Sequence, residues 1–434
     1  ANWVIGRLSH SQTTYSHSYG GAVAAPITRE SSWEYYQNGS PFYGMLKSET
    51  VEPNRPTLSK KTTYSYNTYG LKASVVQSAE NVASRTTDYL YDQRGRFMVQ
   101  ESNSLGHQIL YDYDDVTGNL LSVTDPNGLV SSNEYDSVGR KTREIAADGT
   151  SSLIEYKSCE FSCPNHAVYY TESWKASTSG AKISPLSRQY MDVLGRTVEA
   201  RTQGFNGEWI VQKTEYDSLG YEKRVSEPFY ESDVPHWNIV TSRDVKGRVT
   251  QKSNASGLMI EMTYAGLSTQ TVRSWTDPLN GASESRTSSV LNDVSGNKRR
   301  SVDNGGRAVI FTYDALNNLT QIDLPGGMTV TNDYDVVGRR IASSDPNIGD
   351  WKYAYDAFGQ LTLQENGAGR RVCLSYDVLG RKVSRIDDYL SNATWATAMA
   401  SALNNCQGQI ASTRWRYDDA SKGVGRLSGV TMGG

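Results

Sequence analysis

A short motif, Tyr-Asp-x-x-Gly-Arg, recurs along most of this chain and limits what the chain can fold into. Copies or close relatives of it begin at Tyr66, Tyr91, Tyr113, Tyr135, Tyr216, Tyr313, Tyr334, Tyr355, Tyr376 and Tyr417. The four copies from Tyr313 to Tyr376 follow one another with a strict period of 21 residues. Periods of this length are typical of repeat proteins, in which each unit is one supersecondary element that stacks on its neighbours.

Each repeat predicts a β-hairpin. The residues before Asp314 are β-branched and aromatic, which favours a strand. An aspartate opens a turn by accepting hydrogen bonds from backbone N–H groups, and the glycine that follows supplies a positive φ. Where Asn317 replaces this glycine, asparagine serves because it tolerates left-handed geometry. A second strand and a second turn, such as Asp-Pro-Asn-Gly at 125–128, complete the unit.

Hairpins joined in series are expected to pair edge to edge and, because strands twist, to coil. The sequence therefore predicts an all-β fold of tandem antiparallel β-hairpin repeats. We expect these repeats to form a long coiled sheet, part of a hollow shell or barrel, with one short helical insertion. The residues expected to build the repeat are Tyr91, Asp92, Gly95, Arg96, Tyr135, Asp136, Gly139, Arg140, Tyr313, Asp314, Tyr334, Asp335, Gly338, Arg339, Tyr355, Asp356, Gly359, Tyr376, Asp377, Gly380 and Arg381.

The spacing of the motif suggests a division of the chain into two parts. Residues 1–60 are predicted to form a partly irregular opening segment, and 61–434 the repeat array. Longer gaps between copies predict insertions near 157–188 and 388–412. Repeat proteins usually carry such insertions on one face.

Two segments depart from the repeat most clearly. Residues 17–58 are rich in Tyr, Trp, Pro and Ser without a clear period, and are interpreted as a cap or a long excursion. The Ala-rich run 392–404 predicts a helix opened by Ser391 or Asn392.

Composition narrows the class of protein further. The net charge is -3, so no basic surplus is present to attract nucleic acid, and none is expected as a partner. No run approaches the roughly 18 apolar residues of a membrane helix, so no membrane span is expected. The hydrophobic share of 37% includes 28 tyrosines. So few aliphatic residues favour a large sheet with a wet face, on which tyrosine combines an apolar ring with a polar hydroxyl.

The four cysteines leave two interpretations open. Cys159 and Cys163, with His166 nearby, could form part of a zinc site, but the spacing is loose and no fourth ligand is evident. Alternatively, Cys159, Cys163, Cys373 and Cys406 could form disulfides that close the two insertions, which suits an exported protein. The pairing does not follow from the sequence. We expect neither a metal nor a cofactor.

No catalytic constellation stands out. The five histidines lie in no nucleophile motif, and Gly-x-Ser-x-Gly, His-Glu-x-x-His and Walker motifs are absent from the sequence. A glycosidase needs one pair of facing carboxylates, whereas most aspartates here recur with the repeat, as turn formers do. The chain is therefore not expected to be an enzyme.

The tryptophans allow a binding alternative. Aromatic rings on a sheet can stack on sugars, although packing between neighbouring layers is the simpler interpretation. The residues concerned are Trp33, Trp174, Trp209, Trp237, Trp275, Trp351, Trp395 and Trp415.

The repeated motif resembles that of the YD repeats, also called Rhs repeats, over roughly 60–430. The opening Asn-Trp-Val-Ile-Gly-Arg-Leu-Ser at 2–9 is similar to the segment that precedes the repeats in SpvB/TcdB-like proteins of insecticidal toxin complexes. The resemblance implies a spiral β-sheet wound into a hollow shell around a C-terminal toxic polypeptide. Shell-forming members continue into a self-cleaving aspartyl core. This sequence stops at Met-Gly-Gly, 432–434, without that core, so we expect either an excerpt or the shell wall alone, with no catalytic residue to carry over.

The resemblance also implies the partners and location. The leading hypothesis is a structural shell segment of a secreted or cell-surface bacterial toxin of the polymorphic or insecticidal type. Its partners would be the enclosed toxin polypeptide and other shell segments of a longer chain or complex. The alternative is an extracellular carbohydrate- or cell-surface-binding module, similar to an adhesin or to the teneurins, with a cell-surface glycan as its ligand.

Overall fold

The computed structural model describes residues 6–19, 22–160, 163–404, 406 and 409–433. The first residues of the opening segment discussed above, 2–5, therefore lie outside the described part. Of the strands in the described residues, thirty-four belong to one antiparallel sheet, and a two-stranded ribbon and a single short helix accompany them. This architecture confirms the predicted all-β fold of antiparallel hairpins with one helical insertion.

The chain divides into two compact units. Unit 1 comprises Ala1–Asp112, Val123–Leu129 and Val309–Gly434, and unit 2 comprises Tyr113–Ser122 and Val130–Ala308. This division differs in kind from the predicted boundary between residues 60 and 61, which stays a prediction.

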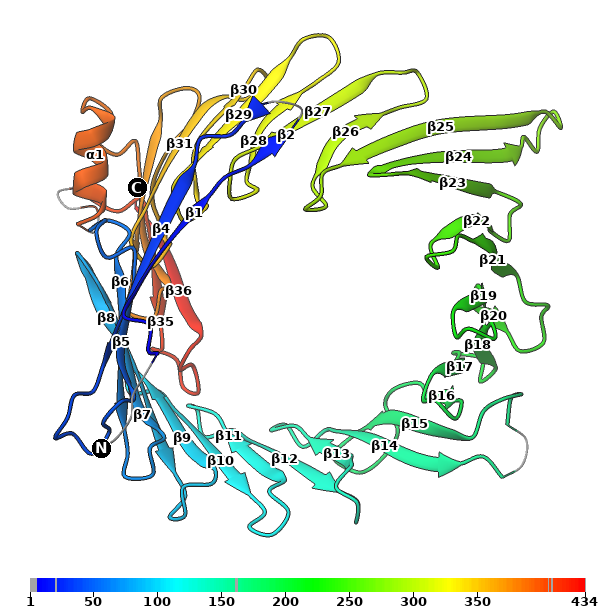
Figure 1. Ribbon diagram of the computed structural model, residues 1–434. Helices are drawn as coiled ribbons and strands as arrows, with labels where there is room; N and C mark the ends of the chain where they lie inside the picture. Colours follow the sequence, from blue (N-terminus) through cyan, green and yellow to red (C-terminus); the bar gives the residue numbers. More distant parts are fainter. Residues whose placement is uncertain (1–5, 20–21, 161–162, 405, 407–408, 434) are drawn as a thin grey trace. The chain divides into compact units, whose positions relative to one another are not determined.

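Unit 1 contains the early and the late strands of the chain (Figure 1). The early strands are β1 (His10–Tyr15), β2 (Ser18–Tyr19), β3 (Ala22–Val23), β4 (Ile27–Tyr35), β5 (Leu46–Val51), β6 (Lys60–Tyr66), β7 (Lys72–Ala79), β8 (Val82–Tyr91), β9 (Met98–Asn103) and β10 (Gln108–Tyr113). The late elements are β27 (Ala308–Tyr313), β28 (Leu319–Asp323), β29 (Thr329–Tyr334), β30 (Arg340–Asp345), β31 (Gly349–Tyr355), β32 (Leu361–Glu365), β33 (Arg371–Tyr376), β34 (Lys382–Asp387), α1 (Trp395–Ala402), β35 (Thr413–Tyr417) and β36 (Leu427–Met432).

Unit 2 contains the middle strands, and β11 (Leu120–Thr124) contributes residues to both units, as do β10 and β27 with one end residue each. The middle strands are β12 (Val130–Tyr135), β13 (Lys141–Ile145), β14 (Ser151–Ser158), β15 (Tyr169–Ala176), β16 (Ser187–Met191), β17 (Thr197–Gln203), β18 (Trp209–Tyr216), β19 (Glu222–Ser226), β20 (Phe229–Tyr230), β21 (Trp237–Arg243), β22 (Val249–Ser253), β23 (Met259–Ala265), β24 (Ser268–Thr276), β25 (Ser283–Asn292) and β26 (Lys298–Val302).

Strands pair with their neighbours in chain order, as serial hairpins should. In unit 2, β12 pairs with β13, β13 with β14 and so on to β18, which is flanked by both β19 and β20. The register shifts by one residue where the motif tyrosine ends its strand, for example between Glu134 and Tyr135. Such a bulge increases the local twist, so every repeat bends the sheet at the same point.

The hairpins place two kinds of turn at opposite edges of the sheet. At the Tyr-Asp edge, the motif aspartate opens each turn, and these turns include 136–140, 192–196, 217–221, 244–248, 293–297, 314–318, 335–339, 356–360, 377–381 and the longer turn 418–426. At the distal edge, the other connection of each repeat turns back, as at 103–107, 125–129, 204–208, 254–258, 303–307 and 366–370.

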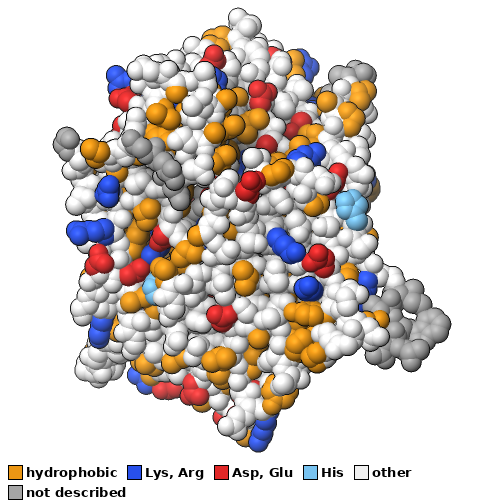
Figure 2. Space-filling model, turned by 90° about the vertical axis from the view of Figure 1, so that its left-hand side faces the viewer, with side chains coloured by type: hydrophobic (Ala, Val, Ile, Leu, Met, Phe, Trp, Pro, Cys, Tyr) orange, Lys and Arg blue, Asp and Glu red, His pale blue; other side chains and the backbone are white. Residues whose placement is uncertain are grey.

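Within unit 1, the early strands lie beside the late strands (Figure 1). The distal-edge turn of Asn127 contacts the Tyr-Asp-edge turn of Val424, and Arg85, near the distal end of β8, reaches Gln360. The sheet of unit 1 thus returns on itself, with the distal edge of one stretch against the Tyr-Asp edge of another. Figure 2 views this side of the molecule, where apolar, cationic and anionic side chains are interspersed.

The segment 17–58 is not a cap separate from the sheet. Within it, β4 and β5 pair antiparallel, and the register shifts at Tyr35 as it does at the motif tyrosines. This hairpin is therefore a further copy of the repeat. Its sequence hides the period because Tyr36, and not aspartate, follows Tyr35.

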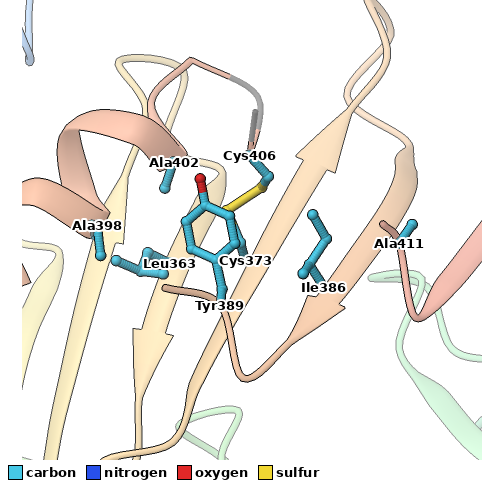
Figure 3. Close-up of a cluster of buried hydrophobic side chains, with 9 residues drawn as sticks. Leu363, Cys373, Ile386, Tyr389, Ala398, Ala402, Cys406 and Ala411 are labelled. Atoms are coloured by element: carbon cyan, nitrogen blue, oxygen red, sulfur yellow. A yellow bond between two sulfur atoms is a disulfide. The ribbon is translucent and has the colours of Figure 1, made fainter. Parts of the chain in front are cut away.

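The described residues contain one hydrophobic core cluster, and it lies under α1 (Figure 3). Leu363 of β32 and Cys373 of β33 are fully buried there, together with Tyr389 and Ala398. The small alanines on this face of α1 let the helix approach the strands closely. Elsewhere in the described part, most strand residues are only half-buried, as in a sheet whose two faces both meet solvent.

The predicted helix is present, but it begins later than expected. Thr394 caps α1, and its Oγ1 accepts a hydrogen bond from the Thr397 N–H at 3.2 Å. The predicted caps, Ser391 and Asn392, lie in a turn before it.

A buried arginine explains the shift. The Nη1 of Arg371 donates hydrogen bonds to the carbonyl oxygens of Leu390 and Ala393, at 2.8 and 2.7 Å. Because the guanidinium binds these two carbonyls, the residues before Thr394 form a turn. The first helical hydrogen bonds therefore start after this turn.

Candidate functional site

The motif turn is a compact hydrogen-bonded structure, seen clearly at Asp136. The Asp136 N–H donates to the Arg140 carbonyl at 2.9 Å, and the Gly139 N–H donates to the Asp136 carbonyl at 3.0 Å. Gly139 has a φ of 81°, so this three-residue loop needs a residue that tolerates left-handed geometry. The glycine of the motif is therefore a requirement of the backbone.

The aspartate side chain holds the turn from inside. Oδ1 of Asp136 accepts the N–H groups of Val138 and Arg140 at 3.0 and 2.9 Å, and Oδ2 accepts Nε of Arg140 at 2.7 Å. Hydrogen bonds from Arg140 hold the pKa of the Asp136 carboxyl below its ordinary value. Both carboxylate oxygens are engaged, so this aspartate acts as a structural group.

The arginine of one repeat reaches the tyrosine of the next. The guanidinium carbon of Arg140 lies 4.2 Å from the centroid of the Tyr156 ring. The same contact joins Arg196 to Tyr216 at 4.1 Å, Arg248 to Tyr264 at 4.1 Å, Arg339 to Tyr355 at 5.1 Å and Arg381 to Tyr417 at 4.4 Å. Cation–π contacts of this kind contribute roughly 0.5–1 kcal/mol each at exposed sites.

The tyrosine hydroxyl closes the link between repeats. The Tyr264 hydroxyl donates to the Val249 carbonyl at 2.9 Å, and Val249 directly follows Arg248, which covers the Tyr264 ring. The same pattern recurs where Tyr355 donates to Arg340. Each ring is thus fixed to the strand that leaves the preceding turn, and the motif is a relay of aspartate, arginine and tyrosine along the Tyr-Asp edge.

The predicted repeat residues take these positions throughout the chain. Tyr91, Tyr135, Tyr313, Tyr334, Tyr355 and Tyr376 end their strands at a bulge, and the aspartates that follow open their turns. Gly95, Gly139, Gly338, Gly359 and Gly380 all have positive φ.

Departures from the motif keep its chemistry. In the turn of Asp314, Asn317 has a φ of 66°, which confirms that asparagine replaces glycine there. Asn318 stands where other copies have arginine, and its Nδ2 donates to Oδ2 of Asp314 at 2.8 Å. Sequence reasoning missed this substitution, and it missed the contact between each arginine and the next tyrosine. The available signal was the spacing of 16 residues between arginine and tyrosine, which recurs in three of these five pairs, as from Arg140 to Tyr156.

One disulfide lies within the first insertion, and the other joins β33 to the residues after α1. Cys159 is joined to Cys163, and Cys373 to Cys406, and no free cysteine is described. Among the described residues, no group of three or more His, Cys, Asp or Glu side chains is placed to hold a metal ion. Within the same residues, no helix is long and apolar enough to cross a bilayer.

The eight tryptophans considered for sugar binding are all half-buried. Six have a cation of a neighbouring residue over the ring: Trp174 with Lys182, Trp209 with Arg188, Trp237 with Arg224, Trp275 with Arg286, Trp395 with Lys352 and Trp415 with Lys382. A sugar stacking on the same ring face would have to displace this cation. Carbohydrate binding stays a prediction.

Unit 2 also carries ion pairs along the face of its strands. Glu172 of β15 is buried and is bound by Arg188 at 2.6 Å and Lys157 at 3.3 Å. Burial alone would raise the pKa of the Glu172 carboxyl, but these two cations hold it below its ordinary value. The buried charge of Glu172 is therefore compensated by partners on both adjacent strands.

The chain matches known proteins at the level of the repeat and of the fold. Residues 113–151 match the family described as RHS Repeat. No curated protein sequence matches the chain.

Solved structures resemble the chain over nearly its whole length. A crystal structure of TcdB2–TccC3 matches 95% of the chain with a TM-score of 0.69 at 12% sequence identity. TcdB2–TccC3–Cdc42 matches 94% with a TM-score of 0.57 at 13% identity. TcdB2–TccC3 without its hypervariable C-terminal region matches 91% with a TM-score of 0.57 at 12% identity.

The chain spans only 28%, 24% and 30% of the lengths of these three proteins. At such low identity the likeness concerns the fold. Together with the repeat match, it confirms the resemblance drawn from the motif: residues 113–151 match the RHS repeat, and the fold is similar to part of TcdB2–TccC3.

Proposed function

We propose that this chain is a wall segment of a bacterial toxin shell that encloses a C-terminal toxic polypeptide. The observation that carries the proposal is the fold match to TcdB2–TccC3 over 95% of the chain. On this proposal the chain is secreted or presented at the cell surface, its partners are the enclosed polypeptide and other shell segments, and it catalyses no reaction itself.

The way the sheet is stabilised supports a wall. A single-layered sheet cannot rely on a hydrophobic core, and the described residues contain one core cluster, under α1. The relay of aspartate, arginine and tyrosine provides an alternative, because it links successive repeats through contacts that tolerate water. Such a sheet can carry solvent on one face and an unfolded polypeptide on the other.

The solved relatives support an enclosed cargo. One of the TcdB2–TccC3 structures lacks a hypervariable C-terminal region, so that protein possesses a variable segment distinct from the rest. Another contains Cdc42 in addition to TcdB2–TccC3. A wall that does not depend on the sequence of its contents is compatible with variable cargo.

Protease protection of the cargo tests the proposal. The complete natural polypeptide or complex that contains this chain is treated with a nonspecific protease, and its fragments are followed by mass spectrometry. We expect the variable segment to resist cleavage while the sheet is folded and to be digested once urea unfolds the sheet. The matched control is the same segment expressed alone. Equal digestion rates for the segment alone and within the folded protein would contradict enclosure.

A further inference from the structure

The two disulfides of the chain lie in different surroundings. Cys373 is fully buried and Cys406 is 3% exposed, and both belong to the core cluster that contains Leu363, Tyr389 and Ala402 (Figure 3). A thiolate reduces a disulfide only by reaching one of its sulfurs directly, so the cluster shields this bond. Reduction of the Cys373–Cys406 pair therefore requires the core under α1 to open first.

The Cys159–Cys163 disulfide lies at the surface. Both cysteines are only half-buried, and their neighbours Ser158, Glu160 and Asn165 are exposed. The two cysteines are 4 residues apart in the sequence, against 33 for the buried pair. Because so short a loop gains little conformational freedom when it opens, reduction of this pair does not require the neighbouring strands to unfold.

This disulfide lies at a turn whose sequence departs from the motif. After Tyr156, Lys157 occupies the place that aspartate holds in other copies. The Cys159 N–H donates to the Val168 carbonyl at 3.0 Å and closes the hairpin of β14 and β15, as the Asp136 N–H closes its own turn. In the Asp136 turn the carboxylate holds the loop from inside, whereas here a covalent bond between two cysteines does so.

The same turn contains a residue in a left-handed conformation. His166 has a φ of 70°, in the region where Gly139 of a motif turn has 81°. A side chain with a Cβ disfavours this conformation, which glycine adopts without cost. The Ala167 N–H donates to the Pro164 carbonyl at 3.1 Å, and Pro164 directly follows Cys163. The disulfide thus restrains the residue from which this local turn starts.

We propose that Cys159–Cys163 is a thiol–disulfide exchange site, which a small thiol such as glutathione reduces in the folded chain while Cys373–Cys406 stays oxidised. Reduction removes the covalent restraint on the turn and loosens the connection between β14 and β15. The turn therefore distinguishes an oxidising compartment from a reducing one. This role goes beyond that of a shell wall and does not depend on an enclosed cargo.

The exchange takes two steps. A thiolate of the reductant attacks one sulfur of the pair, the bond between Cys159 and Cys163 breaks, and the released cysteine takes up a proton. A second thiolate then attacks the mixed disulfide and releases the other cysteine, which also takes up a proton. The two reductant molecules end joined by a disulfide, and they have supplied the two electrons and two protons that the chain gains.

Differential alkylation of the oxidised, folded chain tests the exchange. The chain is held in a graded series of reduced and oxidised glutathione, quenched with iodoacetamide, and its labelled peptides are quantified by mass spectrometry. We expect Cys159 and Cys163 to be labelled at least about tenfold faster than Cys373 and Cys406, because a thiolate reaches the first pair without unfolding. Equal rates for the two pairs, or labelling of the first pair only in urea, would overturn the proposal.

Hydrogen exchange of the same samples tests whether the turn loosens. Reduction by glutathione should raise exchange in peptides that span 156–170 and leave β32 and β33 unchanged. The matched variant Cys159→Ser with Cys163→Ser should show the raised exchange with and without glutathione. Reduction of the pair in the unaltered chain without a change in exchange at 156–170 would overturn the switch.

These measurements are independent of the enclosed polypeptide. Both use the unaltered chain, so they stand even where the serine variant folds poorly. Failure of the exchange would leave enclosure untouched, whereas digestion of the cargo within the folded protein would overturn enclosure alone.

Discussion

Strands β32 and β33 and strands β12 and β13 carry the same repeat, yet they are stabilised in different ways. In β33, four of the six residues are buried, because α1 and Tyr389 cover that part of the sheet. In β12 and β13 no residue is fully buried. This difference shows that the repeat does not need a hydrophobic core to form its hairpins. Where α1 covers the sheet, the strands bury apolar residues. Elsewhere, polar contacts between successive turns stabilise the sheet.

The largest expected effect concerns a buried ion pair in unit 2. Asp293 and Arg299 are both almost fully buried, with Nε of Arg299 donating to Oδ2 of Asp293 at 2.9 Å. Asp293→Ala leaves this arginine charge buried, and the free energy of unfolding should fall by about 3–5 kcal/mol in a urea titration. Asp136→Ala removes a half-buried copy of the same turn aspartate, whose arginine partner is exposed, and is the control. A loss no larger than that of the control would show that the pair behaves like any other turn.

The next effect concerns the covered region. Cys373→Ala with Cys406→Ala opens a loop whose cysteines are 33 residues apart, which should destabilise unit 1 by about 3–4 kcal/mol. Hydrogen exchange should rise in α1, β32 and β33 but not in β12 and β13. Cys159→Ala with Cys163→Ala opens a loop of only 4 residues' separation and should cost about 2 kcal/mol. Exchange that rises equally in both units would contradict separate modes of stabilisation.

Acid should weaken the ion pair between Arg381 and Asp418 at the last turn of unit 1. The guanidinium of Arg381, bonded to both carboxylate oxygens, lowers the pKa of Asp418 to about 2. Because the unfolded pKa is about 3.9, this stabilisation is fully present above pH about 4 and is lost as pH falls through about 2; it amounts to about 2 kcal/mol. Urea midpoints measured between neutral pH and pH about 2 should therefore fall more steeply for the unaltered chain than for Asp418→Asn. Identical slopes would exclude Asp418 as the group responsible.

The smallest expected effect concerns the relay between repeats. Arg140→Lys keeps the charge but loses the planar guanidinium over Tyr156, and should lower the free energy of unfolding by about 0.5–1 kcal/mol. The thermal unfolding of Arg140→Lys is compared with that of Arg307→Lys. This comparison isolates the contact with the Tyr156 ring, because Arg307 pairs with an aspartate, Asp303, in a distal-edge turn. An equal loss of unfolding free energy in both variants would assign the effect to the ion pair between arginine and aspartate alone.

Much of the fold was predictable because its information is local. Aspartate and glycine at fixed offsets determine a turn wherever they occur, so the hairpins, their edges and the Asn317 substitution followed from the sequence. The hairpin of β4 and β5 was missed because Tyr36 replaces the aspartate, and the register of the strands maintains the repeat without it. The start of α1 was misplaced because Arg371, far along the chain, binds the carbonyls of Leu390 and Ala393.

The contacts of the motif turn were predictable only in part, because only those between residues close together in the sequence could be inferred. The sequence indicated that Asp136 and Arg140 belong to one turn, since they lie close together along the chain. It did not indicate that the guanidinium covers Tyr156, because that contact depends on the pairing and bulge of the intervening strands.

By itself, the sequence determined that this chain repeats one hairpin, that each hairpin turns at an aspartate and a glycine, and that no large core is required. Tertiary structure decided which copies are covered. Phe358 and Leu219 occupy the same place in equivalent turns of two different repeats, but Phe358 lies beneath Arg85, whereas Leu219 is 81% exposed. The reason is physical: a turn is specified by neighbouring residues, whereas its cover is supplied by residues from a distant part of the chain, brought there by the accumulated twist of many strands.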